Sequence, residues 1–198
     1  MLRSIIVDYL ERSFELDNVA VAYIYCSYKE RENQTAVNLI GNLVLQLAQR
    51  HTVLSDEITS LYHRHIKKQT RPTINELSGL LQSEINRFLR VFVVIDALDE
   101  CPQGKDARDI FLSEVQKLQP GIHLLVTSRH DTQIEREFGN AARLEIRAND
   151  SDVRKYLKGR IASMSQLVRH VKKDPTLQDI IINTLAEKAE GMYVLIRP

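Results

Sequence analysis

Residues 91–100 read Val-Phe-Val-Val-Ile-Asp-Ala-Leu-Asp-Glu, an apolar run that ends in three carboxylates within five residues. The run is rich in β-branched residues, which predicts a strand buried on both faces of a parallel sheet. Ligands of such sheets bind outside the carboxyl ends of the strands. Carboxylates placed there can hold a hydrated Mg²⁺ and act on water, as nucleotide hydrolysis requires. The stretch therefore predicts a fold class and a candidate site together.

The stretch looks like a Walker B motif, but the sequence lacks the second motif that a P-loop NTPase needs. That motif is Gly-x-x-x-x-Gly-Lys-Ser/Thr, whose backbone N–H groups wrap the phosphates while its Lys neutralises them. The one Gly-Lys pair, Gly104-Lys105, is followed by Asp106, and Asp99 stands five positions before Gly104. Because the pair also follows the candidate strand, we interpret it as a polar loop.

Composition limits the classes of protein to which the chain can belong. Its 198 residues fit one domain of ordinary size, and the 43% apolar and 27% charged residues are typical of a globular protein. The net charge of +1 gives no general attraction to nucleic acid or to a membrane surface. No apolar run approaches the roughly 20 residues of a membrane helix, and the first residues lack a signal-peptide pattern. Two cysteines make no disulfide framework, so we expect a reducing, cytoplasmic setting.

Helical periodicity and short apolar runs alternate along the first three quarters of the chain. This alternation predicts a parallel sheet that is covered by helices. We expect strands over 19–25, 91–96, 122–127 and around 143–146, and helices over 2–14, 33–50, 54–66, 74–89, near 106–118 and over 131–138.

The pattern after residue 149 is entirely helical. The sequence predicts one helix over 149–164, with three residues able to cap its start, Asp150, Ser151 and Asp152. Asp174-Pro175 predicts the start of a second helix, because an N-cap residue is followed there by proline at the first helical position. That helix is expected to run to Glu190 and to stop at Gly191. We therefore place a domain boundary near residue 148.

Five segments, taken in order, resemble a NACHT domain, and the resemblance covers nearly the whole chain. It is closest to the NACHT domains of fungal NOD-like receptors, which belong to the STAND class of signalling ATPases. NACHT domains typically have a small residue directly after the first acid of the Walker B motif, followed by two further acids. The segments are Val-Ala-Tyr-Ile-Tyr-Cys-Ser-Tyr at 21–28, Asn33-Gln34-Thr35, Asp96-Ala97-Leu98-Asp99-Glu100-Cys101, Leu125-Val126-Thr127-Ser128-Arg129 and Ala189-Glu190-Gly191-Met192-Tyr193.

The resemblance implies a role for each residue of the candidate site. Asp96 would hold Mg²⁺ through water, and Asp99 or Glu100 would orient or deprotonate the attacking water. Arg129 matches the sensor 1 arginine, whose guanidinium can contact the γ-phosphate of ATP. Thr127 and Ser128 would belong to the nucleotide site beside it, although they could equally cap the helix expected over 131–138. Cys101 is interpreted as a packing residue.

The resemblance also implies a fold, a switch and partners. The fold is an α/β core of the P-loop NTPase type over residues 1–148, without its first strand and P-loop, followed by the start of the NACHT-associated helical region over 149–198. In this family ATP binding with Mg²⁺ opens the protein for self-association with other NACHT protomers, and hydrolysis resets it. Nucleic acid and membranes are not expected partners. We expect a truncated chain that binds ATP poorly, the alternative being a non-catalytic interaction or regulatory module.

Overall fold

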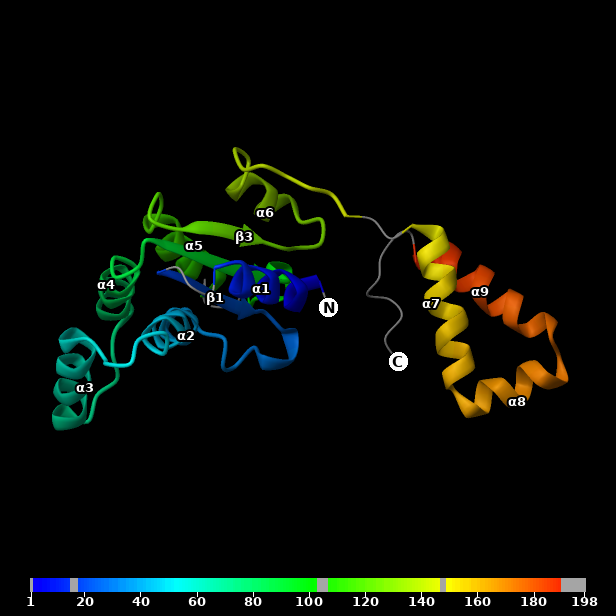
Figure 1. Ribbon diagram of the computed structural model, residues 1–198, viewed down its shortest axis with the longest axis horizontal. Coiled ribbons are helices and arrows are strands. Elements are labelled where there is room, and N and C mark those ends of the chain that lie inside the picture. The colour runs from blue at the N-terminus through cyan, green and yellow to red at the C-terminus, as the bar shows by residue number, and fades with distance from the viewer. Residues whose placement is uncertain (1, 15–17, 103–106, 147–148, 190–198) are drawn as a thin grey trace. The chain divides into compact units, whose positions relative to one another are not determined.

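The computed structural model describes residues 2–14, 18–102, 107–146 and 149–189. The chain forms two compact units, Met1–Gly139 and Asn140–Pro198, and each is described here by itself. The first unit is an α/β unit built on a small parallel sheet, and the described elements of the second unit are helices (Figure 1). The sequence placed the boundary near residue 148. Whether the units are a nucleotide-binding core and its associated helical region stays a prediction.

Three parallel strands form the sheet, in the order β1-β2-β3. They are β1 (Val19–Tyr25), β2 (Arg90–Asp96) and β3 (His123–Val126). The central strand β2 is the predicted apolar run, and four of its seven residues are buried because helices cover both of its faces. Tyr25 lies opposite Asp96, and Ile95 lies opposite Val126, so the three strands end at the same edge of the sheet.

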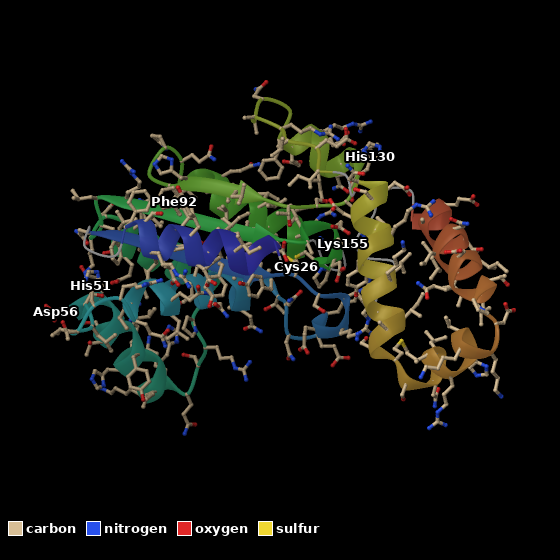
Figure 2. The ribbon with its side chains drawn as sticks, turned by 45° about the vertical axis from the view of Figure 1, so that its right-hand side comes forward. Cys26, His51, Asp56, Phe92, His130 and Lys155 are labelled. Atoms are coloured by element: carbon tan, nitrogen blue, oxygen red, sulfur yellow. The ribbon has the colours of Figure 1, made fainter. Side chains whose placement is uncertain are left out.

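The helices of the first unit divide between the two faces of the sheet. On one face α1 covers a small apolar cluster in which its Val7 meets Val21 of β1 and Val94 of β2. On this side Phe92, labelled in Figure 2, stacks on Phe14 with ring centroids 5.5 Å apart. The larger core on the other face joins alternate residues of β1 and β2 to apolar residues of α2, α4 and α5. The bounds are α1 (Leu2–Ser13), α2 (Ala36–Ala48), α3 (Asp56–Lys68), α4 (Ile74–Ile85), α5 (Ala107–Lys117) and α6 (Thr132–Glu137).

Side chains from α2 and from the loop before it cover the outer edge of β1. The Gln46 amide accepts the Tyr23 backbone N–H at 2.9 Å and donates to the Tyr23 carbonyl oxygen at 2.8 Å. Gln34 donates in the same way to the Tyr25 carbonyl oxygen at 2.8 Å. These amides imitate the backbone of a neighbouring strand, so the edge does not offer a free row of backbone groups to another chain.

The second unit contains α7 (Asp150–Ser163), α8 (Ser165–Lys173) and α9 (Thr176–Ala189). Its own small core joins Val153, Leu157 and Ile161 of α7 to Ile182 of α9. Asn149 caps α7 by accepting the Ser151 N–H, in place of the three residues expected to do so. The sequence predicted α7 and α9 but not α8. The expected end of α9 at Gly191 lies outside the described residues.

The strand expected around residues 143–146 is absent from the described structure, and that prediction is wrong. The segment alternates polar and apolar residues, but Leu144 and Ile146 are exposed. It belongs to the second unit, whose described elements are all helices, so no strand there supplies the backbone partners that a strand requires. Among the described residues, no helix combines the length and the apolar character that crossing a membrane would take.

Candidate functional site

The candidate site is built from the turns that follow the three strands. Parallel strands bring their carboxyl ends to one edge of the sheet, so residues far apart in sequence become neighbours there. The turn after β2 carries Asp96, Asp99 and Glu100, and the segment after β3 carries Thr127 and Arg129. The structure brings these two groups into direct contact. A third segment, which follows β1, reaches the same place through the Cys26 N–H, which donates to the Asp96 carbonyl oxygen at 3.0 Å.

Thr127 links the ends of β2 and β3. Its hydroxyl donates to Asp96 Oδ1 at 2.6 Å and accepts the backbone N–H of Ala97 at 3.0 Å. Its carbonyl oxygen also accepts the Leu98 N–H at 2.9 Å. The Asp96 carboxylate is therefore held in a fixed orientation by a residue 31 positions further along the chain.

The turn after β2 aims its acids by means of an unusual backbone conformation. Ala97 has φ 56° and ψ 49°, the left-handed conformation that disfavours residues with a Cβ atom. The turn then continues as a short 3₁₀ helix, η2 (Leu98–Glu100), whose Leu98 side chain is fully buried. Because Leu98 anchors the turn in the core, Asp99 and Glu100 are directed toward the segment that follows β3.

Asp99 and Arg129 form the closest charged contact of the site. Asp99 Oδ1 accepts the Arg129 backbone N–H at 3.0 Å, and Asp99 Oδ2 accepts the Nε–H of the guanidinium at 2.5 Å. These hydrogen bonds and the charge of Asp99 raise the pKa of Arg129 above its ordinary value. The side chain of Asp99 is only 10% exposed, whereas that of Arg129 is 57% exposed. Asp99 thus holds the backbone N–H and the Nε of Arg129, while the outer end of the arginine side chain faces solvent.

Glu100 is less tightly engaged than Asp99. Its Oε1 lies 4.0 Å from Arg129 Nη2, and its Oε2 accepts the Tyr28 backbone N–H at 3.4 Å. Of the two acids proposed to act on water, Glu100 therefore has the weaker contacts. Both oxygens of Asp99 already accept hydrogen bonds from Arg129.

Neither Thr127 nor Ser128 caps the helix that follows, so that alternative is wrong. The cap of α6 is Asp131, whose Oδ1 accepts the N–H groups of Gln133 and Ile134, and these bonds lower the Asp131 pKa. Asp131 lies closer to the first turn of the helix, where a capping side chain can reach the N–H groups. Ser128 is exposed and its hydroxyl donates to the Arg129 carbonyl oxygen at 2.7 Å.

The sequence did not point to Arg108 as part of this region. Its side chain is only 1% exposed, and it donates to Gln133 Oε1 at 2.8 Å and to Asp131 Oδ2 at 3.4 Å. A buried arginine needs such partners because an unpaired charge inside a protein is costly. It ties α5 to the start of α6, and thereby to the segment that carries Arg129. An arginine within an amphipathic helix pattern gives no sign that it will be buried.

The described residues contain no group of three or more histidine, cysteine or acidic side chains able to hold a metal ion by themselves. This does not exclude Mg²⁺, because that ion usually takes one or two carboxylates and completes its shell with water and substrate phosphates. Asp96, half-buried and oriented by Thr127, is a carboxylate of this kind.

The fold and the site define the first unit as a small parallel α/β unit whose polar residues gather at the carboxyl ends of its strands. A family model described as Nephrocystin 3, N-terminal matches residues 1–129, from α1 to the site arginine Arg129. The chain therefore belongs to the nephrocystin 3 N-terminal family. A search of curated proteins finds no match to the chain. The finer resemblance to NACHT domains of fungal NOD-like receptors stays a prediction.

Proposed function

We propose that the first unit is a nucleotide-dependent switch module of the NACHT type, in which the strand ends handle Mg²⁺ and the terminal phosphate of ATP. The observation that carries this proposal is the pairing of Asp99 with Arg129 across the ends of β2 and β3. An arginine whose backbone N–H and Nε are held by a carboxylate, and whose outer guanidinium nitrogens face solvent, can exchange that carboxylate partner for a phosphate. Such an exchange would transmit the presence of the phosphate to the turn after β2.

Each residue of the site has a role in this proposal. Asp96 would bind the hydrated Mg²⁺, with Thr127 holding its carboxylate in place. Mg²⁺, when bound, would neutralise charge on the phosphate oxygens. Arg129 would contact the terminal phosphate, and Asp99 would position Arg129. Glu100 would orient the attacking water, because its oxygens make the weaker contacts.

A second candidate is a non-catalytic interaction or regulatory module. The sequence contains no Gly-x-x-x-x-Gly-Lys-Ser/Thr motif, so the chain by itself lacks the usual ligands of the β- and γ-phosphates. We therefore expect the isolated chain to bind Mg-ATP weakly, with a dissociation constant well above the micromolar range. The association of NACHT protomers that the family resemblance implies would then be the function that remains.

Nuclear magnetic resonance can test the proposal, because it detects binding that is too weak for calorimetry. Millimolar Mg-ATP is expected to shift the backbone amide signals of residues 96–100 and 127–129. Asp96→Asn, which keeps the acceptor for Thr127 but removes the charge, should abolish these shifts. The matched control Asp152→Asn, at an exposed position of α7, should keep them. Mg-ATP and Mg-ADP should shift these amide signals differently, and Arg129→Gln should remove that difference.

Two results would count against this function. A folded chain without amide shifts at these residues would favour the non-catalytic module. Micromolar binding that survives Asp96→Asn would place the nucleotide elsewhere, and it would overturn the expectation of weak binding.

A further inference from the structure

The outer edge of β3 differs from that of β1, which glutamine amides cover. In the order of the described sheet, β3 is the outer strand on the side opposite β1 (Figure 1). Thr127, directly after β3, donates its N–H to the Ile95 carbonyl oxygen of β2 at 2.9 Å. Backbone groups alternate in direction along a strand, so those of Leu125 also face β2. The N–H and C=O groups of Leu124 and Val126 therefore face outward.

These outward backbone groups are open to another strand. Within the part of the chain that the structure describes, no hydrogen bond is made to the outward groups of Leu124 or Val126. Residues 122–127, Ile-His-Leu-Leu-Val-Thr, include no Lys, Arg, Asp, Glu or Pro. Charged side chains and proline are common means by which proteins prevent an edge strand from pairing with another chain. The β3 edge lacks both of these protections.

Leu125 adds an apolar contact to this edge. Its neighbour in β2 is Val94, which lies in the cluster under α1, so Leu125 points to the same face of the sheet. Leu125 is nevertheless 40% exposed, because α1 packs on β1 and β2. On the other face, Ile134 of α6 shares the larger core with Leu124 and Val126. An exposed leucine thus lies between the two residues whose backbone groups face outward.

We propose that the β3 edge binds a second copy of this chain, strand against strand, about a two-fold axis at Leu125. Antiparallel pairing about this axis places Leu124 opposite Val126 of the other copy. The outward groups of these residues then form four hydrogen bonds, because each such pair exchanges two. Leu125 lies opposite its own counterpart in a pair that is not hydrogen-bonded, where side chains approach most closely. The sheets of the two copies join into one continuous sheet.

The edge is complementary to itself, which favours a second copy over an unrelated strand. One two-fold axis matches every outward donor to an acceptor and closes the assembly as a dimer. The same pairing brings no like charges together, because Arg129 falls opposite Gly121 of the other copy. β3 has only four residues, so the contact is smaller than the roughly 1,200 Å² of a stable interface. We therefore expect a weak dimer, which needs no nucleotide.

Analytical ultracentrifugation at concentrations up to about 1 mM measures this equilibrium. The chain should show a monomer–dimer equilibrium, and Leu125→Lys, which places two positive charges opposite each other, should weaken the dimer about tenfold. Because Leu125 is exposed, the monomer should stay folded. The matched control Leu45→Lys, at an exposed position of α2, should dimerise like the unmodified chain. Mixing Leu125→Lys with Leu125→Glu should restore a dimer that contains one copy of each.

Hydrogen exchange identifies the strand that pairs. As the concentration rises, the amides of Leu124 and Val126 should gain protection, whereas that of Leu125, which already faces β2, should change little. Asp96→Asn should dimerise like the unmodified chain even though it loses the nucleotide-dependent amide shifts, so this result is separate from the proposed function.

Three outcomes would overturn the inference. A chain that stays monomeric over the whole concentration range would leave the edge to a different strand. A dimer that Leu125→Lys does not weaken would use another surface. An assembly that grows beyond two copies would exclude the closed two-fold pairing.

Discussion

At the scale of single residues, Thr127 connects the carboxylate of Asp96 to the strained turn at Ala97. One hydroxyl serves both groups, as donor to the first and as acceptor from the second. Such a residue is not easily replaced, because valine has the same shape but cannot form either bond. The left-handed conformation of Ala97 makes the second bond important, since it helps to hold a backbone that most side chains disfavour.

We expect Thr127→Val to destabilise the first unit by about 1 to 3 kcal/mol, because the Ala97 N–H loses its partner in a partly buried position. Thr127→Ser should recover most of this loss. Urea unfolding followed by circular dichroism measures the difference. The control Thr59→Ala removes an exposed hydroxyl within α3 and should change stability by no more than about 0.5 kcal/mol. Equal effects of Thr127→Val and Thr59→Ala would show that the Thr127 bonds do not hold the turn.

The sequence could predict that these polar residues follow the ends of β2 and β3, but not how they pair. The sequence alone indicates an apolar run that ends in acids and a later strand that ends in Thr-Ser-Arg. The contact between Asp99 and Arg129 depends on the register of β2 against β3, which no local pattern specifies. The burial of Arg108 depends in the same way on how distant segments pack.

At the scale of elements, most strands and helices were predicted close to their observed bounds, whereas one helix was missed and one expected strand is absent from the described structure. β1, β2 and β3 lie within a residue of their expected bounds. The separate helix α8 was missed because Met164, at its start, forms no side-chain capping bond and leaves no mark in the sequence. The strand expected around 143–146 was wrong because alternation of polar and apolar residues shows a preference for strand but not the presence of a partner.

The covering of the β1 edge by Gln46 gives the first prediction at this scale. Gln46→Met keeps the size of the side chain but leaves the N–H and C=O of Tyr23 without their partner. We expect a loss of about 1 to 3 kcal/mol in unfolding free energy and faster hydrogen exchange at the Tyr23 amide. The control Gln49→Met changes an exposed residue at the end of the same helix and should alter neither quantity. Unchanged exchange at Tyr23 in Gln46→Met would refute the role of the amide.

The start of α4 gives a prediction that depends on pH. The Glu76 carboxylate accepts the Thr73 N–H and hydroxyl, each at 2.9 Å, and these bonds lower its pKa from 4.5 to about 2. Because the folded-state pKa is depressed, the stabilisation is complete above pH 4.5 and disappears as the pH falls toward 2. A carboxyl titration followed by magnetic resonance should show this value for Glu76.

Thr73 and Glu76 form a capping box at the start of α4, and a variant separates the two bonds that Glu76 accepts from Thr73. Thr73→Ala removes the hydroxyl but keeps the backbone N–H, so the pKa of Glu76 should rise and yet stay below its ordinary value. The Thr59→Ala variant should leave it where it is. A pKa near the ordinary value in the unmodified chain would mean that the capping box does not form in solution.

At the scale of the whole molecule, the chain consists of two compact units that each possess an apolar core. The family match over residues 1–129 falls within the first unit, which also contains the candidate site. The core of the second unit is small, with four buried residues among those that the structure describes. Small units bury a low fraction of their surface and are correspondingly marginal in stability.

We therefore expect a single core substitution to unfold one unit without the other. Leu157→Ala should remove about 2 to 5 kcal/mol, as much as a small unit can have, so amides of α7, α8 and α9 should lose their protection from hydrogen exchange. Amides of β1, β2 and β3 should keep theirs. Leu43→Ala, in the larger core, should have the opposite pattern. If Leu157→Ala also exposed the strands to exchange, the two units would fold as one cooperative body. Unfolding of the helices would then also disrupt the contact between Asp99 and Arg129.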